Sequence, residues 1–230
     1  MKKNDLLFLV CFILFFTPFF ISERVFEIYQ TLNRNHGFVM SFFKFAILAT
    51  LGESIGLRIS KGVYNQKGFG LVSRAIVWGF LGLTIKMAFV IFGEGTPKFL
   101  HFLGFNQAIE LFKGSFSAGK ILVAFAISAA MNTIYAPVMM TLHKITDIHI
   151  LSTGGTVKGL FTKIQFGKII TELNWDVQWN FVFKKTIPFF WIPAHTITFL
   201  LPAEYQVLFA AILGIILGLL LAIANLKSIK

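Results

Sequence analysis

Two apolar stretches decide the fold of this chain: FVMSFFKFAILATLGESIGL at Phe38–Leu57 and LVSRAIVWGFLGLTIKMAFVIF at Leu71–Phe92. Each is long enough to cross the hydrocarbon core of a bilayer, which takes about 20 apolar residues. Each also contains charged side chains, namely Lys44, Glu53, Arg74 and Lys86. A charge inside hydrocarbon costs at least about 2–3 kcal/mol, so such side chains are expected to face the bundle interior or a cavity and to have partners.

The composition of the whole chain places it in a membrane. Of its 230 residues, 56% are hydrophobic and 13% are charged, which is too little polar surface to cover a soluble globule. The net charge of +11 does not indicate nucleic-acid binding, because Lys and Arg are spread between the apolar segments, as positive-inside topology requires. The expected partner is therefore the lipid bilayer and not a nucleic acid.

Hydrophobic periodicity and segment length predict an all-α, polytopic transmembrane helix bundle of about six spans, forming one membrane domain over residues 1–230. The expected spans are 6–22, 38–57, 71–92, 119–142, 181–201 and 204–224. Three amphipathic stretches are expected to be interfacial helices, at about 24–36, 98–113 and 157–173. Lys and Arg are more frequent in the connections that lie inside if the N-terminus is inside, so both termini are expected inside.

Counting residues along the spans sorts the charges into two groups. Glu53 and Arg74 are expected near the inner surface, as partners on neighbouring antiparallel helices. Lys44 and Lys86 are expected in the outer half of the bilayer, together with His195. This arrangement predicts an inner and an outer polar cluster.

Structural and functional interpretations of these residues both remain open. Glu53 and Arg74 form either an ion pair that fixes helix packing or a gate in a pathway. Lys44 and Lys86 either extend to the outer interface or form a cationic vestibule for anions. Asn132 is either an amide that hydrogen-bonds between helices or part of a pore lining.

Three prolines inside the predicted spans, Pro137, Pro188 and Pro193, are expected to kink their helices, either for packing or because a broken helix lines a substrate path. No catalytic motif is present, and the histidines have no metal-binding spacing. We therefore expect no catalytic residues, no metal and no cofactor, and the chain is not expected to be an enzyme.

Several short patterns occur in one order along residues 24–224. They are Tyr29-Gln30 with Leu32 and His36, Gly52-Glu53-Ser54-Ile55, Arg74 ahead of Gly79 and Gly82, Ala136-Pro137, and Phe189-Phe190-Trp191-Ile192-Pro193. Together they resemble the Mpv17/PMP22 family of integral membrane proteins, of which this chain would be a divergent and bacterial member. The resemblance implies a compact α-helical membrane protein with a channel-like role for a small solute.

The expected function is therefore passage of a small solute or ion through a helix bundle, with Lys44, Glu53, Arg74, Lys86 and Asn132 lining or gating the path. One alternative is a non-transporting scaffold or assembly factor, in which Glu53→Gln would lower stability without changing any flux. Another is a membrane-embedded lipid-modifying enzyme, which needs a second acid, a His or a metal site beside Glu53. The expected location is a bacterial plasma membrane, alternatively an organelle membrane, and a homo-oligomer is left open.

Overall fold

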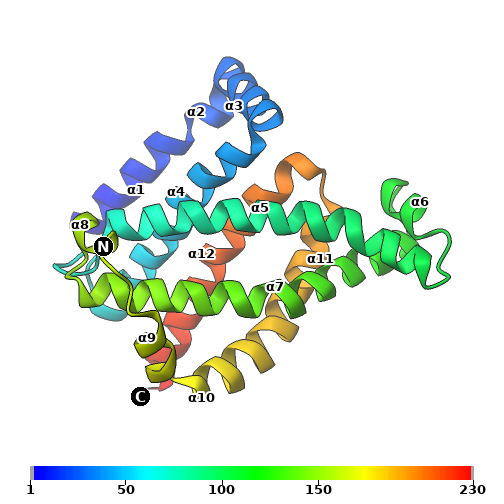
Figure 1. Cartoon of the computed structure of the whole chain (residues 1–230). Coiled ribbons are helices and arrows are strands. Elements are labelled where there is room, and N and C mark those ends of the chain that lie inside the picture. The colour runs from blue at the N-terminus through cyan, green and yellow to red at the C-terminus, as the bar shows by residue number, and fades with distance from the viewer. Residues whose placement is uncertain (1–2, 229–230) are drawn as a thin grey trace. The chain divides into compact units, whose positions relative to one another are not determined.

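The computed structural model describes residues 3–228, and the side-chain environments of residues 4–219. All regular structure in this range is helical (Figure 1). The helices in chain order are α1 Lys3–Phe16, α2 Pro18–Ile21, α3 Glu23–Asn35, α4 Gly37–Lys61, α5 Leu71–Phe102, α6 Ala108–Lys113, α7 Ala118–Ser152, α8 Val157–Leu160, α9 Phe166–Glu172, α10 Trp175–Val177, η1 Gln178–Trp191, α11 Ile192–Leu200 and α12 Ala203–Ser228. The predicted all-α fold is confirmed for these residues.

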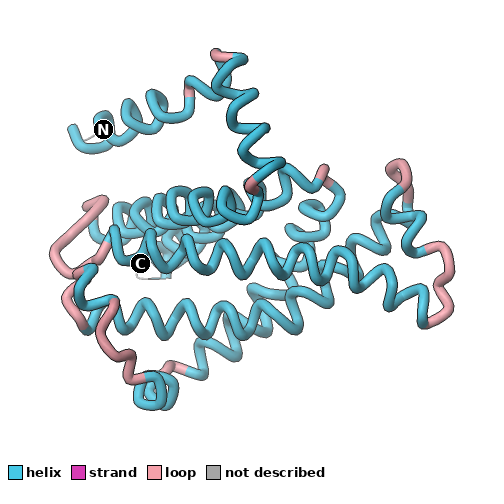
Figure 2. Tube along the Cα trace, turned by 45° about the horizontal axis from the view of Figure 1, so that its top comes forward, coloured by secondary structure: helices cyan, strands magenta, loops and turns pink. Residues whose placement is uncertain are grey.

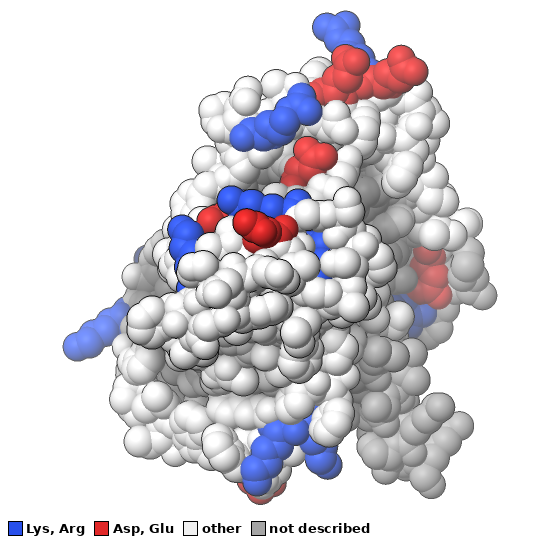
Figure 3. All heavy atoms as spheres, turned by 90° about the vertical axis from the view of Figure 1, so that its right-hand side faces the viewer, with Lys and Arg blue, Asp and Glu red and all other residues white. Residues whose placement is uncertain are grey.

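Four helical stretches are long and apolar enough to cross a membrane: Asn4–Ile21, Gly37–Lys61, Leu71–Phe102 and Ala118–Ser152. On the face that Figure 3 shows, Lys, Arg, Asp and Glu gather in a few groups, and wide areas between these groups carry none of them. Many large hydrophobic side chains of the long helices are exposed, among them Phe80, Val90, Ile91, Leu122 and Ile134. A soluble protein rarely exposes so much apolar surface. The helices therefore indicate a membrane protein.

The chain forms two compact units, Met1–Met40 and Ser41–Lys230. In the first unit, the predicted span 6–22 is interrupted at Thr17, between α1 and α2. Pro18 lacks the N–H that would continue the helix, so it begins a new one at the position where the missing donor costs nothing. The predicted helix at 24–36 is confirmed as α3, whose N-cap Ser22 accepts a hydrogen bond from the Val25 N–H.

In the second unit, two helices are longer than predicted. α5 continues through Gly93, Gly95 and Pro97 to Phe102, and α7 continues ten residues beyond the predicted end at Leu142. The prediction of an interfacial helix at 98–113 was therefore wrong, since its first part belongs to α5 and only α6 is separate. Single glycines cost a helix about 1 kcal/mol each, which packing in a long helix overcomes.

The connection after α7 also differs from the prediction. The expected surface helix at 157–173 is two short helices, α8 and α9, separated by residues 161–165. The predicted fifth span, 181–201, changes its winding along its length, because residues 178–191 form the π-helix η1 and residues 192–200 form α11. The connection between the last two predicted spans is short, and α12 packs against α11.

The predicted proline kinks stay predictions, but the structure places each proline. α7 is helical on both sides of Pro137, and Pro188 lies inside η1. Pro193 occupies the first turn of α11, where a missing N–H is tolerated. The change from π to α winding thus falls between the two prolines of this segment.

α5 and α7 lie side by side as the longest helices of the second unit (Figure 2). α4 packs on α5 at Gly82, where an added Cβ would come within 2.6 Å of the Ser41 carbonyl oxygen. At Gly214 on α12, in contrast, an added Cβ would meet nothing within 4 Å.

Candidate functional site

The second unit encloses a cavity of about 400 Å³ between α4, α5, α7, η1, α11 and α12. On α7 the lining residues recur every three or four positions: Met131, Asn132, Tyr135, Ala136, Met139, Met140, His143, Lys144 and Asp147. This spacing is one face of a helix. From Met131 to Asp147 the helix advances by 16 residues, so the lined face is about 24 Å long. The cavity is therefore elongated along α7.

One end of the cavity, which we call the charged end, is formed by Glu53, Arg74, Trp78, His143, Lys144 and Asp147. Glu53 is the centre of this group. Its Oε1 accepts hydrogen bonds from Trp78 Nε1 at 2.8 Å and from His143 Nε2 at 3.2 Å, and its Oε2 pairs with Arg74. Because an ionised carboxylate can only accept, His143 must carry its proton on Nε2.

Arg74 joins the two acids of the charged end. Its guanidinium pairs with Glu53 and with Asp147, and its Nε donates to the Phe69 carbonyl at 2.7 Å. The Arg74 side chain is only 8% exposed. Lys144 lies 3.5 Å from the other Asp147 oxygen and is 53% exposed. Arg74 and Lys144 thus place two positive charges beside the two carboxylates.

A contact between two turns positions Arg74. Gly70, which precedes α5, and Gly155, which follows α7, both have positive φ, and a Cβ on Gly70 would lie 2.9 Å from the Gly155 Cα. Ser73 Oγ adds a hydrogen bond to the Gly155 carbonyl at 3.1 Å. Only glycine combines this backbone conformation with such an approach. The start of α5 is thereby fixed against the end of α7. This contact places Arg74 between Glu53 and Asp147.

The other end of the cavity, which we call the amide end, is formed by Ser128, Asn132, Trp191 and His195. Asn132 is 1% exposed and lies 3.1 Å from His195 Nδ1, and it also donates to Ser128. Ser128 Oγ donates to the Ile192 carbonyl at 2.7 Å. The group therefore ties α7 to α11 at the point where η1 ends, and it contains no permanent charge.

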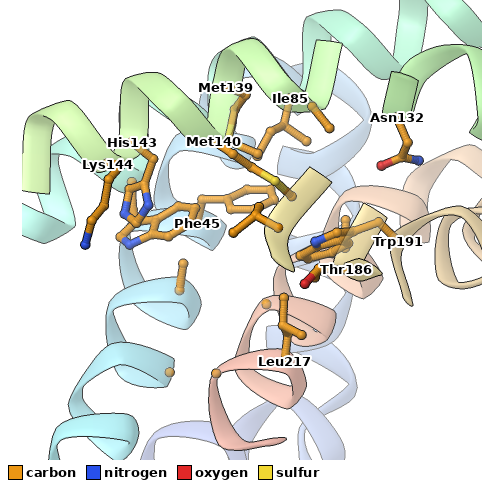
Figure 4. Close-up of a pocket in the computed structure, with 18 of the residues that line it drawn as sticks. Phe45, Ile85, Asn132, Met139, Met140, His143, Lys144, Thr186, Trp191 and Leu217 are labelled. Atoms are coloured by element: carbon orange, nitrogen blue, oxygen red, sulfur yellow. The ribbon is translucent and has the colours of Figure 1, made fainter. Parts of the chain in front are cut away.

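The wall between the two ends is apolar. Met139, Met140 and Ile85 lie between His143 and Asn132, with Phe45 and Leu217 on the opposite side (Figure 4). Methionine side chains are flexible and fill irregular space, which suits a wall that contacts more than one shape of ligand. The cavity thus has a polar group at each end and a hydrophobic middle.

Two polar groups at the cavity have no hydrogen-bond partner among the described residues. The Gln178 side chain is 7% exposed and lines the cavity from the start of η1, yet its amide makes no hydrogen bond to the described chain. The buried Trp191 Nε1–H is also without a partner there. Leaving a fully buried donor such as the Trp191 N–H unsatisfied costs about 1–3 kcal/mol. Both groups therefore indicate a place for a polar molecule.

The structure brings together some of the residues predicted for the site and not others. Glu53 and Asn132 line the cavity, and Arg74 lies directly behind Glu53; the predicted Glu53–Arg74 pair is confirmed. Lys44 and Lys86 are not among the lining residues. His195 was expected in an outer cluster with these lysines but instead contacts Asn132.

Sequence reasoning missed His143 and Asp147, because it ended the fourth span at Leu142 and placed both in a connection. They are four residues apart, so they share a face of α7 once the helix continues to Ser152. Trp78 stands four residues after Arg74 on α5 in the same way. A longer helix assignment would have been the signal for His143 and Asp147, whereas Trp78 already lay in the predicted span 71–92, one turn after Arg74.

The charged end combines a carboxylate with an imidazole at hydrogen-bond distance. Such a pair can bind and release a proton, or position a polar group of a ligand. Among the described residues, no three or more His, Cys, Asp or Glu side chains are placed to hold a metal ion. The side chains of the charged end can therefore exchange protons and form hydrogen bonds beside a largely apolar cavity.

No protein-family model, curated protein or solved structure matches this chain.

Proposed function

We propose that this protein is a multi-pass membrane protein that moves a small solute across the bilayer through the cavity of residues 41–230. One observation carries the proposal: the cavity follows a single face of α7 for about 24 Å, most of the roughly 30 Å of a hydrocarbon core. Polar groups stand at both ends of that face. A solute could therefore exchange contacts with one end for contacts with the other.

The apolar middle favours a carrier over an open pore. A water-filled channel needs polar groups along its length, or it dewets and closes. Here most side chains between the charged end and the amide end are apolar, including Met, Ile, Phe and Leu, and the polar exceptions in the lining are Tyr135, Gln178 and Thr186. The solute would bind in the chamber and be released by a rearrangement of the helices, with the π-helix η1 as the irregular element, since π-helices often occur at functional sites.

The sequence-based topology completes the proposal. We place about six spans in the membrane with both termini inside, so that the charged end lies toward the inner surface. The proposal also includes the resemblance to the Mpv17/PMP22 family and a location in a bacterial plasma membrane. Lys44 and Lys86 would not belong to a pathway through this cavity, because they do not line it. Glu53, Arg74 and Asn132 would remain the residues at its two ends.

Flux through purified protein in liposomes tests the proposal. The probes are glycerol, potassium acetate and a fluorescent lysophospholipid. Gly214→Leu fills the cavity, because Gly214 lines it and a Cβ there meets nothing within 4 Å. The matched control is Gly95→Leu on α5, where a Cβ also meets nothing and no cavity is lined. We expect flux of at least one probe, reduced more than fivefold by Gly214→Leu and unchanged by Gly95→Leu.

Two outcomes would contradict transport. Either no probe crosses in the presence of wild-type protein, or both leucine variants reduce flux equally. If Glu53→Gln then lowers stability and no flux is ever seen, the scaffold alternative is favoured.

A second function has a specific observation in its favour. A lipid-modifying enzyme would need an acid–base pair in a hydrophobic chamber. Glu53 and His143 lie 3.2 Å apart at the charged end of the largely hydrophobic cavity. Incubating the protein with membrane lipids and analysing them by mass spectrometry tests this function. A product formed by wild type and lost in His143→Phe would support it, and unchanged lipids would exclude it for the lipids supplied.

A further inference from the structure

The cavity has the dimensions and chemistry of a site for one extended molecule. About 400 Å³ distributed over about 24 Å leaves room for a single narrow chain. A hydrocarbon core of roughly 30 Å holds two acyl chains end to end, so one chain occupies about 15 Å. The cavity can thus hold one such chain together with a headgroup.

The charged end determines which headgroup fits. Every carboxylate oxygen there already has a partner: Glu53 accepts from Trp78, His143 and Arg74, and Asp147 pairs with Arg74 and Lys144. Arg74 uses three of its five N–H donors in these contacts and with the Phe69 carbonyl, and it is not among the residues that line the cavity. A cationic headgroup would have to share these carboxylates with Arg74 and Lys144, and it would lie beside both cations.

Two other side chains that line the cavity can donate hydrogen bonds to a headgroup: the Lys144 ammonium and the Gln178 amide. Lys144 has a single partner at 3.5 Å and is half-exposed, so its ammonium has donors to spare at the mouth of the cavity. Gln178 is more than nine-tenths buried, lines the same cavity and has no side-chain partner among the described residues. An ammonium and an amide N–H are the donors that bind carboxylates and phosphates.

The geometry points to a single-chain anionic amphiphile as the ligand of this cavity, with a carboxylate or phosphate head at Lys144 and Gln178 and its chain along Met139, Met140 and Ile85. This inference rests on the proposed function for its site and names the class of solute. Both a free fatty acid and an alkyl phosphate have this chemistry.

Binding of a fluorescent polyene fatty acid, cis-parinaric acid, provides the test. Trp78 and Trp191 line the cavity, so bound probe quenches tryptophan emission by energy transfer. The competitors are palmitate, hexadecyl phosphate and uncharged hexadecanol, added to protein in nanodiscs. We expect palmitate or hexadecyl phosphate to displace the probe at a concentration at least tenfold below that of hexadecanol, and the tighter of the two identifies the head.

Lys144→Met separates the headgroup from the chain. We expect this variant to reduce the preference for the anion over hexadecanol to threefold or less, while hexadecanol itself binds as before. The matched control is Lys158→Met on α8, an exposed lysine that does not line the cavity. Gly214→Leu should weaken probe binding more than tenfold, and Gly95→Leu should not.

Three results would overturn the inference: equal displacement by the anions and hexadecanol, no displacement by any of them, or identical behaviour of the two lysine variants. Each is distinguishable from a failure of transport. If small solutes cross and Gly214→Leu stops them while no amphiphile binds, the proposed function stands and the solute class is wrong. If the anions bind as expected but no probe crosses the bilayer, the site stands and transport is wrong.

Discussion

The charged end and the amide end of the cavity stabilise buried polar side chains with different chemistry. Both hold polar side chains between helices that are otherwise apolar. The charged end uses two carboxylates, an arginine and a lysine, whereas the amide end uses a hydroxyl, an amide and an imidazole. The first joins α4, α5 and α7, and the second joins α7 to α11.

The difference in chemistry indicates which end of the cavity is the more rigid. Breaking one contact at the charged end leaves a charge without its partner, which costs far more than losing one neutral hydrogen bond. The amide end can exchange partners cheaply, because Asn132 can present either its nitrogen or its oxygen to His195. We therefore expect the amide end to move and the charged end to hold during any conformational change.

The largest effect is expected for Arg74→Met. This variant leaves Glu53 and Asp147 without their shared partner, and the free energy of unfolding should fall by about 3–5 kcal/mol. Unfolding in mixed detergent micelles measures it. The control is the triple variant Glu53→Gln, Arg74→Met, Asp147→Asn, which has no unpaired carboxylate and should be more stable than Arg74→Met alone. A triple variant less stable than the single one would show that charge is not the cause.

Asn132→Leu should have the next largest effect, about 1–3 kcal/mol, because it removes the hydrogen-bond partner of the buried His195 Nδ1. Replacing both partners, Asn132→Leu with His195→Phe, should recover part of the loss. The two ends lie about 16 Å apart along α7, so this variant and Arg74→Met should add to within about 0.5 kcal/mol. A larger coupling would contradict the view that the two ends are independent.

His143→Phe should cost about 1 kcal/mol. It removes one hydrogen bond to Glu53 but keeps an aromatic ring against Trp78, whose ring centroid lies 4.3 Å away, and Glu53 Oε1 keeps the Trp78 donor. Thermal unfolding and solute flux should be measured on the same sample. Flux that falls while stability is nearly kept would indicate that His143 serves the solute, and equal loss of both would assign it to packing.

The smallest effect on stability is expected for Lys144→Met, below about 0.5 kcal/mol. Its ammonium is half-exposed and 3.5 Å from Asp147, and exposed ion pairs contribute little. Unfolding in low and high salt checks this, since the residual effect should disappear in salt. A loss above 1 kcal/mol would place Lys144 inside the charged network rather than at its edge.

Much of the fold could be predicted from the sequence. Apolar runs of the right length predicted α4, α5, α7 and α12, and the cost of charge in hydrocarbon predicted that Glu53 and Arg74 would find each other. Helix ends were predicted less well. Glycine and proline at Gly93 and Pro97 were read as a break, but packing in a long helix outweighed their local cost.

The site could be predicted only in part. Glu53 and Asn132 stood out because polar residues in apolar runs are conspicuous, whereas Gln178 and Trp191 stood in segments where polar and aromatic residues are ordinary. Lys44 and Lys86 looked like pathway residues by the same rule but do not line the cavity. A charge in a span shows that a partner or cavity exists, and it does not show which one.

By itself, the sequence determined that the chain is helical, that its apolar helices indicate a membrane protein, and that charge is buried among them, because length, apolarity and the cost of a buried charge act locally along the chain. Only the tertiary structure decided which side chains meet. Glu53 and His143 are 90 residues apart, and Asn132 and His195 are 63 apart. Periodicity reports on neighbours within one helix, whereas the cavity exists because six helical segments present particular faces to one another.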